Sequence, residues 1–205
     1  MQDRHHQPAA EIQSEADDVQ RQAGAVTRTK PLPRSFYKRP AVEVARALLG
    51  KILTHGKASG RIVEVEAYLG IDDGAAHSAR GVTPRTRVIF GEPGHAYVYL
   101  IYGMYECLNI VAEPKGTAGC VLIRAIEPMR GIDRPSNGPG KLTRALGITR
   151  RLNGSDVTRG PIRVCAPAKP ERFEIGVSPR IGITKAADLP LRFFIEGNRF
   201  VSRHS

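Results

Sequence analysis

Two carboxylates and an aromatic ring alternate along one predicted β-strand. In the segment 61–70, RIVEVEAYLG, side chains two residues apart share a face of an extended chain. Glu64, Glu66 and Tyr68 therefore lie on one face with Ile62. A carboxylate beside an aromatic ring suits a site that stacks a flat ligand and activates a water. The alternative is a half-exposed strand with solvated glutamates. The opposite face has the composition of a core face: Val63, Val65, Ala67 and Leu69.

Tyrosines form a second cluster of candidate site residues. Four of the six tyrosines stand within nine residues, in the segment 97–105, YVYLIYGMY. Alternation places Tyr97 and Tyr99 on one strand face, and Tyr102 leaves at the strand end before Gly103. Aromatic rings in a basic protein stack on nucleobases. Ordinary packing of strand tyrosines, with their hydroxyls at the rim, is the alternative.

Three single residues stand out by their surroundings. Asn109 and Arg124 lie inside apolar runs, where an amide needs hydrogen-bond partners and a charge is costly unless it is paired. Asn109 bonds either the backbone or a ligand, and Arg124 pairs either with a carboxylate such as Glu127 or with a substrate phosphate. His77 follows Tyr68 by nine residues, and it is either a structural, solvated side chain or part of the site.

The charge of the chain indicates a polyanionic partner. The net charge is +11, and residues 1–34 carry five basic and five acidic side chains, so the whole excess belongs to residues 35–205. The segment 124–163 alone has nine Lys/Arg and three Asp/Glu. A domain this basic is typical of nucleic-acid binding, with anionic membrane as the second possibility and a generic basic excess as the third.

Other classes of protein are disfavoured by what the sequence lacks. It has no apolar run long enough to span a bilayer and no apolar core of a secretory signal. We therefore expect a cytoplasmic protein, associated with the nucleoid in a bacterium or nuclear in a eukaryote, and not a secreted one. Cys107, Cys120 and Cys165 have no CxxC spacing, which indicates reduced thiols, the first two in the core. The histidines show no metal-ligand spacing, so we expect no metal.

The pattern of elements indicates one α+β domain, residues 35–205, after a disordered polar tail, residues 1–34. A helix is expected from Pro40 to Gly50, with Val42, Ala45, Leu48 and Leu49 inward. A second helix is expected over 138–147, with Lys141 and Arg144 outward near a glycine-rich N-terminus that could hold a phosphate. Strands are expected at 51–54, 61–69, 97–101, 107–112, 120–126, 161–165 and 191–196, with loop or short helix over 70–94.

Several of these segments together resemble the alkyladenine (3-methyladenine) DNA glycosylase family. The segments that carry the resemblance occur in that family's order and near its spacing, and they cover about residues 35–202. They are RIVEVEAYLG (61–70), AHS (76–78), TPRTR (83–87), YVYLIYGMY (97–105), CVLIRAIEP (120–128) and GPGKL (138–142). The segment 54–60 is shorter than in longer members, Gly140 stands where some have serine, and 111–118 and 150–175 follow the pattern loosely.

The resemblance implies a role for each matching residue. Glu66 matches the general base, and Arg124 matches an arginine at the catalytic water and the target phosphate. Tyr68, His77 and Tyr99 match the residues around the flipped base, Asn109 matches the one that crowds the guanine 2-amino group, and Tyr102 matches the wedge in the minor groove. The family fold is a single mixed domain around a curved antiparallel sheet with flanking short helices, and it uses no metal or organic cofactor.

We therefore expect a monomeric, monofunctional enzyme that flips alkylated or deaminated purines out of duplex DNA and hydrolyses the N-glycosidic bond. Arg85, Lys141 and Arg144 are the expected backbone contacts, with no membrane partner. Because no lysine belongs to the expected pocket set, a Schiff-base lyase step is not expected. A non-catalytic nucleic-acid-binding module would not need Glu66 in register with Tyr68, and a carbohydrate hydrolase would need a second, opposed carboxylate.

Overall fold

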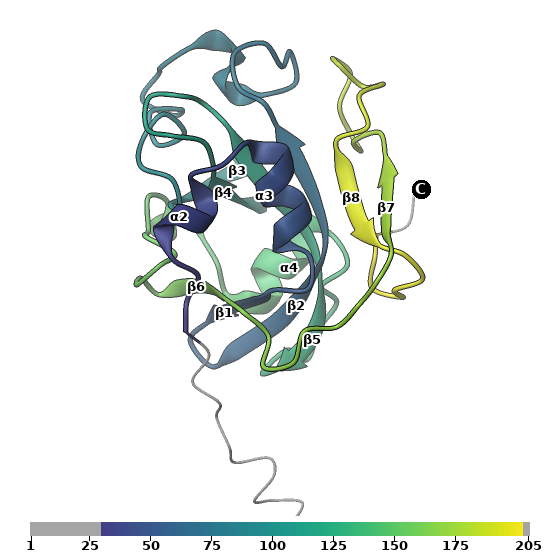
Figure 1. The fold of residues 1–205 in the computed structure, drawn as a ribbon. Coiled ribbons are helices and arrows are strands. Elements are labelled where there is room, and N and C mark those ends of the chain that lie inside the picture. The colour runs from purple at the N-terminus through teal and green to yellow at the C-terminus, as the bar shows by residue number, and fades with distance from the viewer. Residues whose placement is uncertain (1–29, 203–205) are drawn as a thin grey trace, which may run out of the picture.

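The structure is a computed structural model that describes residues 30–202 of the 205-residue chain. Its strands form one antiparallel sheet of eight strands, in the order β3-β4-β5-β2-β1-β6 with β8 and β7 beside β2 (Figure 1). The strands are β1 (Ile52–His55), β2 (Ala58–Tyr68), β3 (Ala96–Ile101), β4 (Tyr105–Val111), β5 (Cys120–Arg130), β6 (Ile162–Cys165), β7 (Ile175–Ser178) and β8 (Arg192–Ile195). The helices are α2 (Arg34–Tyr37), α3 (Ala41–Leu48) and α4 (Pro139–Leu146), with 3-10 turns η1 (His77–Arg80) and η2 (Arg150–Leu152).

The sheet is curved (Figure 1), and two strands share one edge of its central strand β2. Along its other edge, β2 pairs with β5, and both strands have 11 residues. On the shared edge, β1 pairs with residues 58–61 and β8 pairs with residues 64–66. The expected α+β fold, a single domain around a curved antiparallel sheet with short flanking helices, is confirmed.

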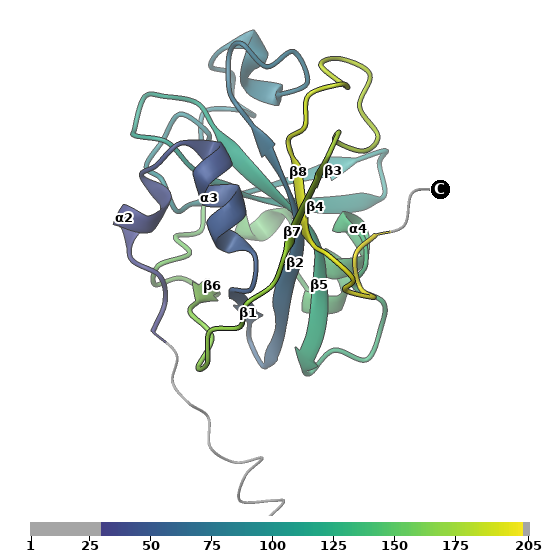
Figure 2. The same cartoon turned by 45° about the vertical axis from the view of Figure 1, so that its right-hand side comes forward.

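Helices cover both faces of the central strands. The helix α3 packs against β2 and β5, and α4 packs against β4 and β5. In Figures 1 and 2, α3 and α4 lie on opposite sides of the sheet. The expected helix near 40–50 is therefore present, and the expected Ala45 and Leu48 are buried. Val44 is fully buried in place of the expected Val42, which is only partly buried. In α4, Leu142 and Leu146 are buried, and the expected outward residues Lys141 and Arg144 are exposed.

A β-bulge in β2 changes the expected division into a core face and a polar face. Ile62 pairs with Ile126 and Glu64 pairs with Ala125, so Val63 is an extra residue on this strand. Ile62 and Val63 consequently both belong to the main hydrophobic core. From Ile62 to Ala67 every residue is buried, and the alternative of a strand with solvated glutamates is wrong. Leu69, expected inward, is 42% exposed after the strand ends.

The packed part of the chain begins before residue 35, the predicted domain boundary. Most of the predicted tail, residues 1–29, lies outside the described residues. Within the described part, Leu32 is buried against the core. Arg34 begins α2 and its Nη2 binds Asp156 Oδ2 at 2.6 Å. Residues 32–34 therefore already pack against the domain.

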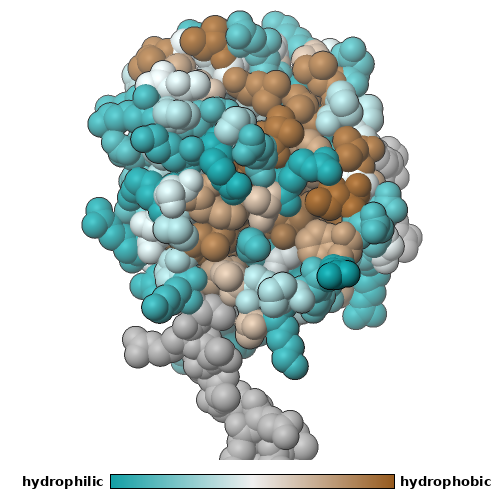
Figure 3. Space-filling model, viewed as in Figure 1, coloured by the Kyte–Doolittle hydropathy of each residue, from teal (hydrophilic) through white to brown (hydrophobic). Residues whose placement is uncertain are grey.

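The strand β7 and the helix α2 are not among the expected elements. The segment 175–178 is only four residues long and contains Gly176, which weakens any alternation signal. This glycine is required by packing, because a Cβ there would collide with the ring of Phe194 in β8. Figure 3 shows hydrophobic residues gathered over the part of this face where the β7–β8 hairpin passes, and hydrophilic ones over the α2 side.

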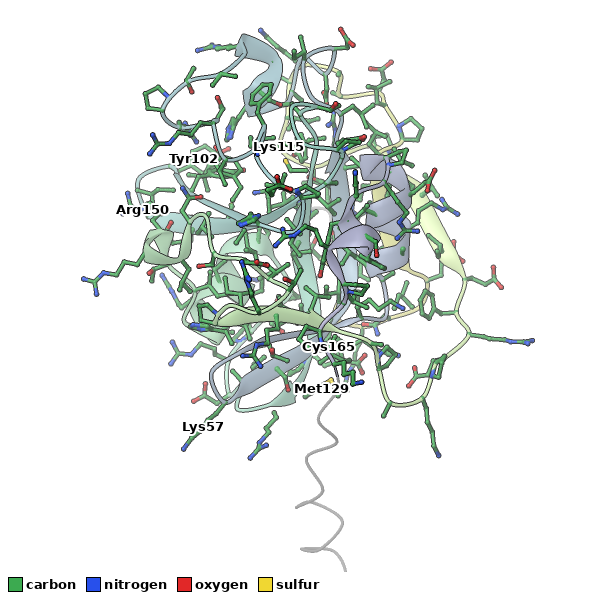
Figure 4. All side chains as sticks on the ribbon, turned by 60° about the vertical axis from the view of Figure 1, so that its left-hand side comes forward. Lys57, Tyr102, Lys115, Met129, Arg150 and Cys165 are labelled. Carbon is green, nitrogen blue, oxygen red and sulfur yellow. The ribbon has the colours of Figure 1, made fainter. Side chains whose placement is uncertain are left out.

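Tyr102 and the β1–β2 turn lie toward opposite ends of the molecule. Figure 4 shows Tyr102 on the far side from Lys57, in that turn, and from Met129, near the end of β5. Pro31, near the start of the described residues, forms a bridge to Cys165 in β6. Within residues 30–202 no helix has the length and apolar character needed to cross a membrane.

Candidate active site

Strand pairing places four side chains in one row across the sheet. Tyr97 in β3 is paired with Asn109 in β4, Asn109 with Leu122 in β5, and Leu122 with Glu66 in β2. Directly paired residues of a sheet project to the same side. Tyr99 and Tyr68 belong to the next rows on that side, because they stand two residues from Tyr97 and Glu66. The predicted site residues of three separate segments therefore meet on one face.

Three residues of this row, Tyr97, Asn109 and Leu122, line a cavity of about 630 Å³. A cavity of this size is in the usual range for small-molecule sites and is ample for a purine base. Eight of the predicted site residues line it: Tyr68, His77, Tyr99, Tyr102, Asn109, Arg124, Lys141 and Arg144. Two predicted residues do not line it, Glu66 and Arg85, and both contact residues that do.

An aromatic wall forms one side of the cavity. The ring of His77 lies 4.6 Å from that of Tyr99 in an edge arrangement, and Tyr97 and Tyr99 lie 5.2 Å apart. His77 Nδ1 is 2.9 Å from the Tyr97 hydroxyl, and the Arg85 guanidinium lies 5.2 Å from the Tyr99 ring centroid. Partial burial of the ring, and then the charge of Arg85, lower the pKa of His77 well below its ordinary value. His77 is therefore neutral at neutral pH and adds no charge to the wall.

The Glu66 carboxylate lies behind the cavity lining, with 0% exposure. Oε2 accepts a hydrogen bond from the Tyr68 hydroxyl at 3.0 Å, and Oε1 accepts one from the Ile181 N–H at 2.8 Å. Arg124 Nη1 is 3.2 Å from Oε1. Burial raises the pKa of Glu66 above its ordinary value, and Arg124, Ile181 and Tyr68 oppose that rise only in part. A buried carboxylate with a raised pKa is suited to accept a proton.

The neighbouring Glu64 has a different environment. Its Oε1 accepts hydrogen bonds from Arg124 Nε at 3.0 Å, Arg192 Nε at 2.7 Å and the Ser202 hydroxyl at 2.7 Å. Burial raises the pKa of Glu64, but Arg124, Ser202 and Arg192 outweigh it, and the net pKa is lowered. Glu64 is therefore an anion at neutral pH, and its hydrogen bond orients Arg124. Arg124 therefore pairs with carboxylates, which was one of its two alternatives, but its partners are Glu64 and Glu66. Glu127, the carboxylate considered as an example, is bound by Arg61.

Asn109 makes the backbone contact that was one of its two alternatives, and it also faces the cavity. It is 2% exposed and lines the cavity. Its Nδ2 donates a long hydrogen bond to the Tyr97 carbonyl at 3.4 Å, and its Oδ1 accepts from Cys120 Sγ at 3.7 Å. Cys107 and Cys120 are buried, as expected, but they also line the cavity. Burial raises the pKa of Cys107 to about 11 and that of Cys120 to about 12, so both remain thiols.

The cavity mouth is formed by the β3–β4 turn and the start of α4. Tyr102 is 76% exposed and has a φ of 52°, a left-handed conformation that is unfavourable for a residue with a side chain. Across the mouth, Gly138 and Lys141 stand at the N-terminal end of α4, and Lys141 Nζ is 3.5 Å from Asn137 Oδ1. The expectation that no lysine belongs to the pocket is therefore wrong.

Sequence reasoning missed several residues that complete the site. Ile181 contributes only a backbone N–H, so its side-chain type gives no signal. Arg192 opens an apolar strand, which is the same signal that identified Arg124. Ser202 stands 138 residues from Glu64, and nothing in the sequence joins them. Within the described residues, no three His, Cys, Asp or Glu side chains gather as metal ligands would.

An aromatic cavity of purine size, a buried carboxylate behind it and cationic side chains at its mouth suit chemistry on a nucleobase. Comparison with known proteins gives the family. The family model of methylpurine-DNA glycosylase matches residues 35–199, and the chain belongs to that family. The expected resemblance is confirmed.

Curated relatives match this chain over nearly all of their own length. A protein of Methanoculleus marisnigri is 52% identical over 190 residues, covering 84% of this chain and 98% of the relative. One of Legionella pneumophila (strain Lens) is 48% identical over 181 residues, covering 85% and 99%. One of Koribacter versatilis is 47% identical over 199 residues, covering 87% and 96%. All three bear the name "Putative 3-methyladenine DNA glycosylase".

Proposed function

We propose that this enzyme, a DNA glycosylase by family, flips alkylated purines such as 3-methyladenine out of duplex DNA and hydrolyses their N-glycosidic bond. The observation that carries the proposal is the position of Glu66, which is buried directly behind Tyr68, a lining residue of a purine-sized cavity. A module that only binds nucleic acid has no use for such a carboxylate, since burying it is costly. A carbohydrate hydrolase needs a second free carboxylate, and Glu64 is held by two arginines.

The chemistry follows from the charge of the lesion. Alkylation at N3 or N7 makes the purine a cation, so the C1′–N bond can break with its electron pair leaving on a neutral base. The sugar then resembles an oxocarbenium ion, which a nearby anion stabilises. A water adds its oxygen to C1′ and gives its proton to Glu66, and an abasic site remains. Arg124, held by Glu64, is placed to orient that water or the target phosphate.

The surroundings of Glu66 leave a water little access to its carboxylate. Both carboxylate oxygens already accept hydrogen bonds, and the residue has 0% exposure. A water reaches Oε2 only if it enters beside the Tyr68 hydroxyl or displaces it. We propose that a base stacked on Tyr68 moves this hydroxyl away from Oε2, so that Glu66 becomes available when substrate is present.

Tyr102 is the proposed wedge that fills the space left by the flipped nucleotide. Its exposure and its left-handed backbone conformation place the ring at the tip of the β3–β4 turn. Strained residues of this kind concentrate at functional sites. Lys141 and Arg144 line the cavity, and Arg85 contacts the hydroxyl of Tyr97 in its wall. These three cations are the proposed contacts to the DNA backbone, the polyanion that this basic domain would bind.

The proposal extends to deaminated purines such as hypoxanthine, with a lower rate. A neutral lesion must gain a proton to leave, and the cavity offers no ready acid: His77 is a neutral base and the pKa of both thiols is raised. We therefore expect cationic alkylated purines to be excised faster than neutral ones. We also propose a monomer that acts on duplex DNA inside the cell.

The test is single-turnover excision with excess enzyme on duplexes that carry 7-methylguanine, 3-methyladenine, ethenoadenine or hypoxanthine, with undamaged adenine and guanine as controls. We expect release of at least one alkylated purine and no release of undamaged adenine or guanine. If the enzyme releases none of the lesion bases, the proposal is contradicted. Since Lys141 lies at the cavity mouth, borohydride is added to a parallel reaction. A hydrolytic, monofunctional enzyme gives no trapped covalent complex, and a trapped complex that Lys141→Gln abolishes overturns this part.

A further inference from the structure

A buried ion pair supports the catalytic residues from outside the cavity. Arg180 Nη1 binds Asp73 Oδ2 at 2.5 Å and Nη2 binds Oδ1 at 2.8 Å, and both side chains have 0% exposure. This two-point contact fixes the plane of the guanidinium as well as its position. Arg180 Nε is buried and has no hydrogen-bond partner among the described residues. Because burying a charged pair is costly, stability alone does not explain why this pair lies here.

The guanidinium of Arg180 holds the ring of Tyr68. It lies 4.6 Å from the ring centroid, and its Nη1 also donates to the Ala67 carbonyl at 3.0 Å. Tyr68 lines the cavity and Arg180 does not. The cation therefore contacts the ring from outside the cavity, and it fixes the orientation of the surface on which a base stacks.

The same ion pair joins the chain segments that supply the other site groups. The residue after Arg180 is Ile181, whose N–H donates to Glu66 Oε1 at 2.8 Å. Asp73 accepts hydrogen bonds from the Leu69 N–H and the Ala75 N–H, each at 3.1 Å, and so orders the loop between Tyr68 and η1. A displacement of the guanidinium would consequently reach the stacking ring and the carboxylate together.

We propose that Arg180, oriented by Asp73, is a positioning residue of the glycosylase site: it sets the plane of Tyr68 and keeps the Ile181 N–H on Glu66. This inference rests on the proposed function, and it adds two residues that the sequence analysis did not single out. Arg180 touches neither the cavity nor the reacting atoms, so its effect passes through Tyr68 and Glu66.

Electrostatics separates this role from mere support of the fold. The Arg180 guanidinium and the Glu66 carboxylate interact, because the charge of Glu66 is one of the influences that raise the pKa of Arg180. By reciprocity the cation favours ionised Glu66, as the Ile181 N–H does. If the Arg180 cation is removed and the Ile181 N–H moves away, the pKa of Glu66 rises further. A variant that loses only fold stability would leave the ionisation of Glu66 unchanged.

The experiment compares Arg180→Gln, Arg180→Lys and the double variant Asp73→Asn/Arg180→Gln with wild type. The double variant leaves no unpaired buried charge, so it remains informative if Arg180→Gln fails to fold. The control is Arg34→Gln, which breaks the ion pair with Asp156 near α2, away from the cavity. Folding is checked by circular dichroism, and single-turnover rates on an ethenoadenine duplex are measured from pH 4.5 to 8.

We expect the folded Arg180 variants to excise at least about tenfold more slowly and the acidic limb of the rate profile to move up by about one pH unit. Arg180→Lys, which keeps the charge, should show the smaller shift of the limb. Arg34→Gln should lower the melting temperature and leave the profile in place. Wild-type rates and an unmoved limb in the folded double variant would overturn the inference while the proposed function stands. Absence of excision by wild type would instead overturn the proposed function.

Discussion

Replacing Glu66 with glutamine should remove excision and leave the protein folded and able to bind its lesion. The amide has the shape of the carboxylate. Its oxygen can keep the hydrogen bonds from the Ile181 N–H and from Arg124, and its NH2 can donate to the Tyr68 hydroxyl, which accepts as well as donates. Every contact of Glu66 in the structure therefore has a counterpart in the variant.

The expected magnitudes differ strongly between rate and stability. A general base contributes about 10²–10⁴-fold, which corresponds to roughly 3–5 kcal/mol of activation free energy. Two opposing effects change the free energy of unfolding of the variant. The variant no longer buries a carboxylate, but Arg124 loses one of its two anionic partners and keeps Glu64. We expect a net change in the free energy of unfolding within about 2 kcal/mol.

The assay is single-turnover release of ethenoadenine, combined with fluorescence titration of the same duplex and thermal melting. The matched control is Glu127→Gln, which makes the same chemical change in a glutamate paired with Arg61 outside the cavity. The control should excise at the wild-type rate. Release by Glu66→Gln within a few-fold of wild type would refute the assignment of Glu66 as the base, and so would equal losses in both variants.

Three further outcomes follow from the structure. Tyr102→Ala should impair flipping of ethenoadenine more than cleavage, with a smaller loss at a mismatch, and stopped-flow fluorescence checks this; complete flipping with slow cleavage would place Tyr102 in the pocket. Affinity for DNA should fall by about 0.9 log units per log unit of salt for each phosphate neutralised, and deletion of residues 1–29, which carry three basic and five acidic side chains, should leave that slope unchanged; a shallow slope or weak binding after deletion counts against this charge map. Glu64→Gln should lower the melting temperature at neutral pH, and the difference from wild type should shrink as pH falls from the ordinary pKa of 4.5 through the lower pKa of the folded state, because the stabilisation is complete above the first value and is lost toward the second; a constant difference down to pH 3 speaks against it.

Long, periodic segments could be predicted from the sequence, and so could the residues they place on one face. The strands near 61–69, 97–101 and 120–126 and the helix over 138–147 are present with shifted ends. Alternation along each strand is enough to group Glu66 with Tyr68 and Tyr97 with Tyr99. It does not say which strands are neighbours, so the row that joins them needed the resemblance or the structure.

The features that escaped prediction depend on long-range contacts or on backbone atoms. The extra residue Val63 in β2 puts Ile62 in the core, and a single sequence carries no mark of such a bulge. Ile181 acts through its N–H, which every residue but proline has. Arg180 and Asp73 stand 107 residues apart, and each alone looks like an ordinary loop charge.

The contrast between Glu64 and Glu66 shows why residue type and spacing do not settle a catalytic role. Both are fully buried on one strand, and Arg124 contacts both. Glu64 also has Arg192 and two donors of Ser202, so its pKa is lowered. Glu66 has one amide and one hydroxyl in their place, so burial prevails and its pKa is raised. The two environments therefore suit the two glutamates to different roles. Glu64 is an anion at neutral pH that orients Arg124, and Glu66 is basic enough to accept a proton. A second arginine hydrogen-bonded to Glu66, as Arg192 is to Glu64, would lower the pKa of Glu66 and make it a weaker base.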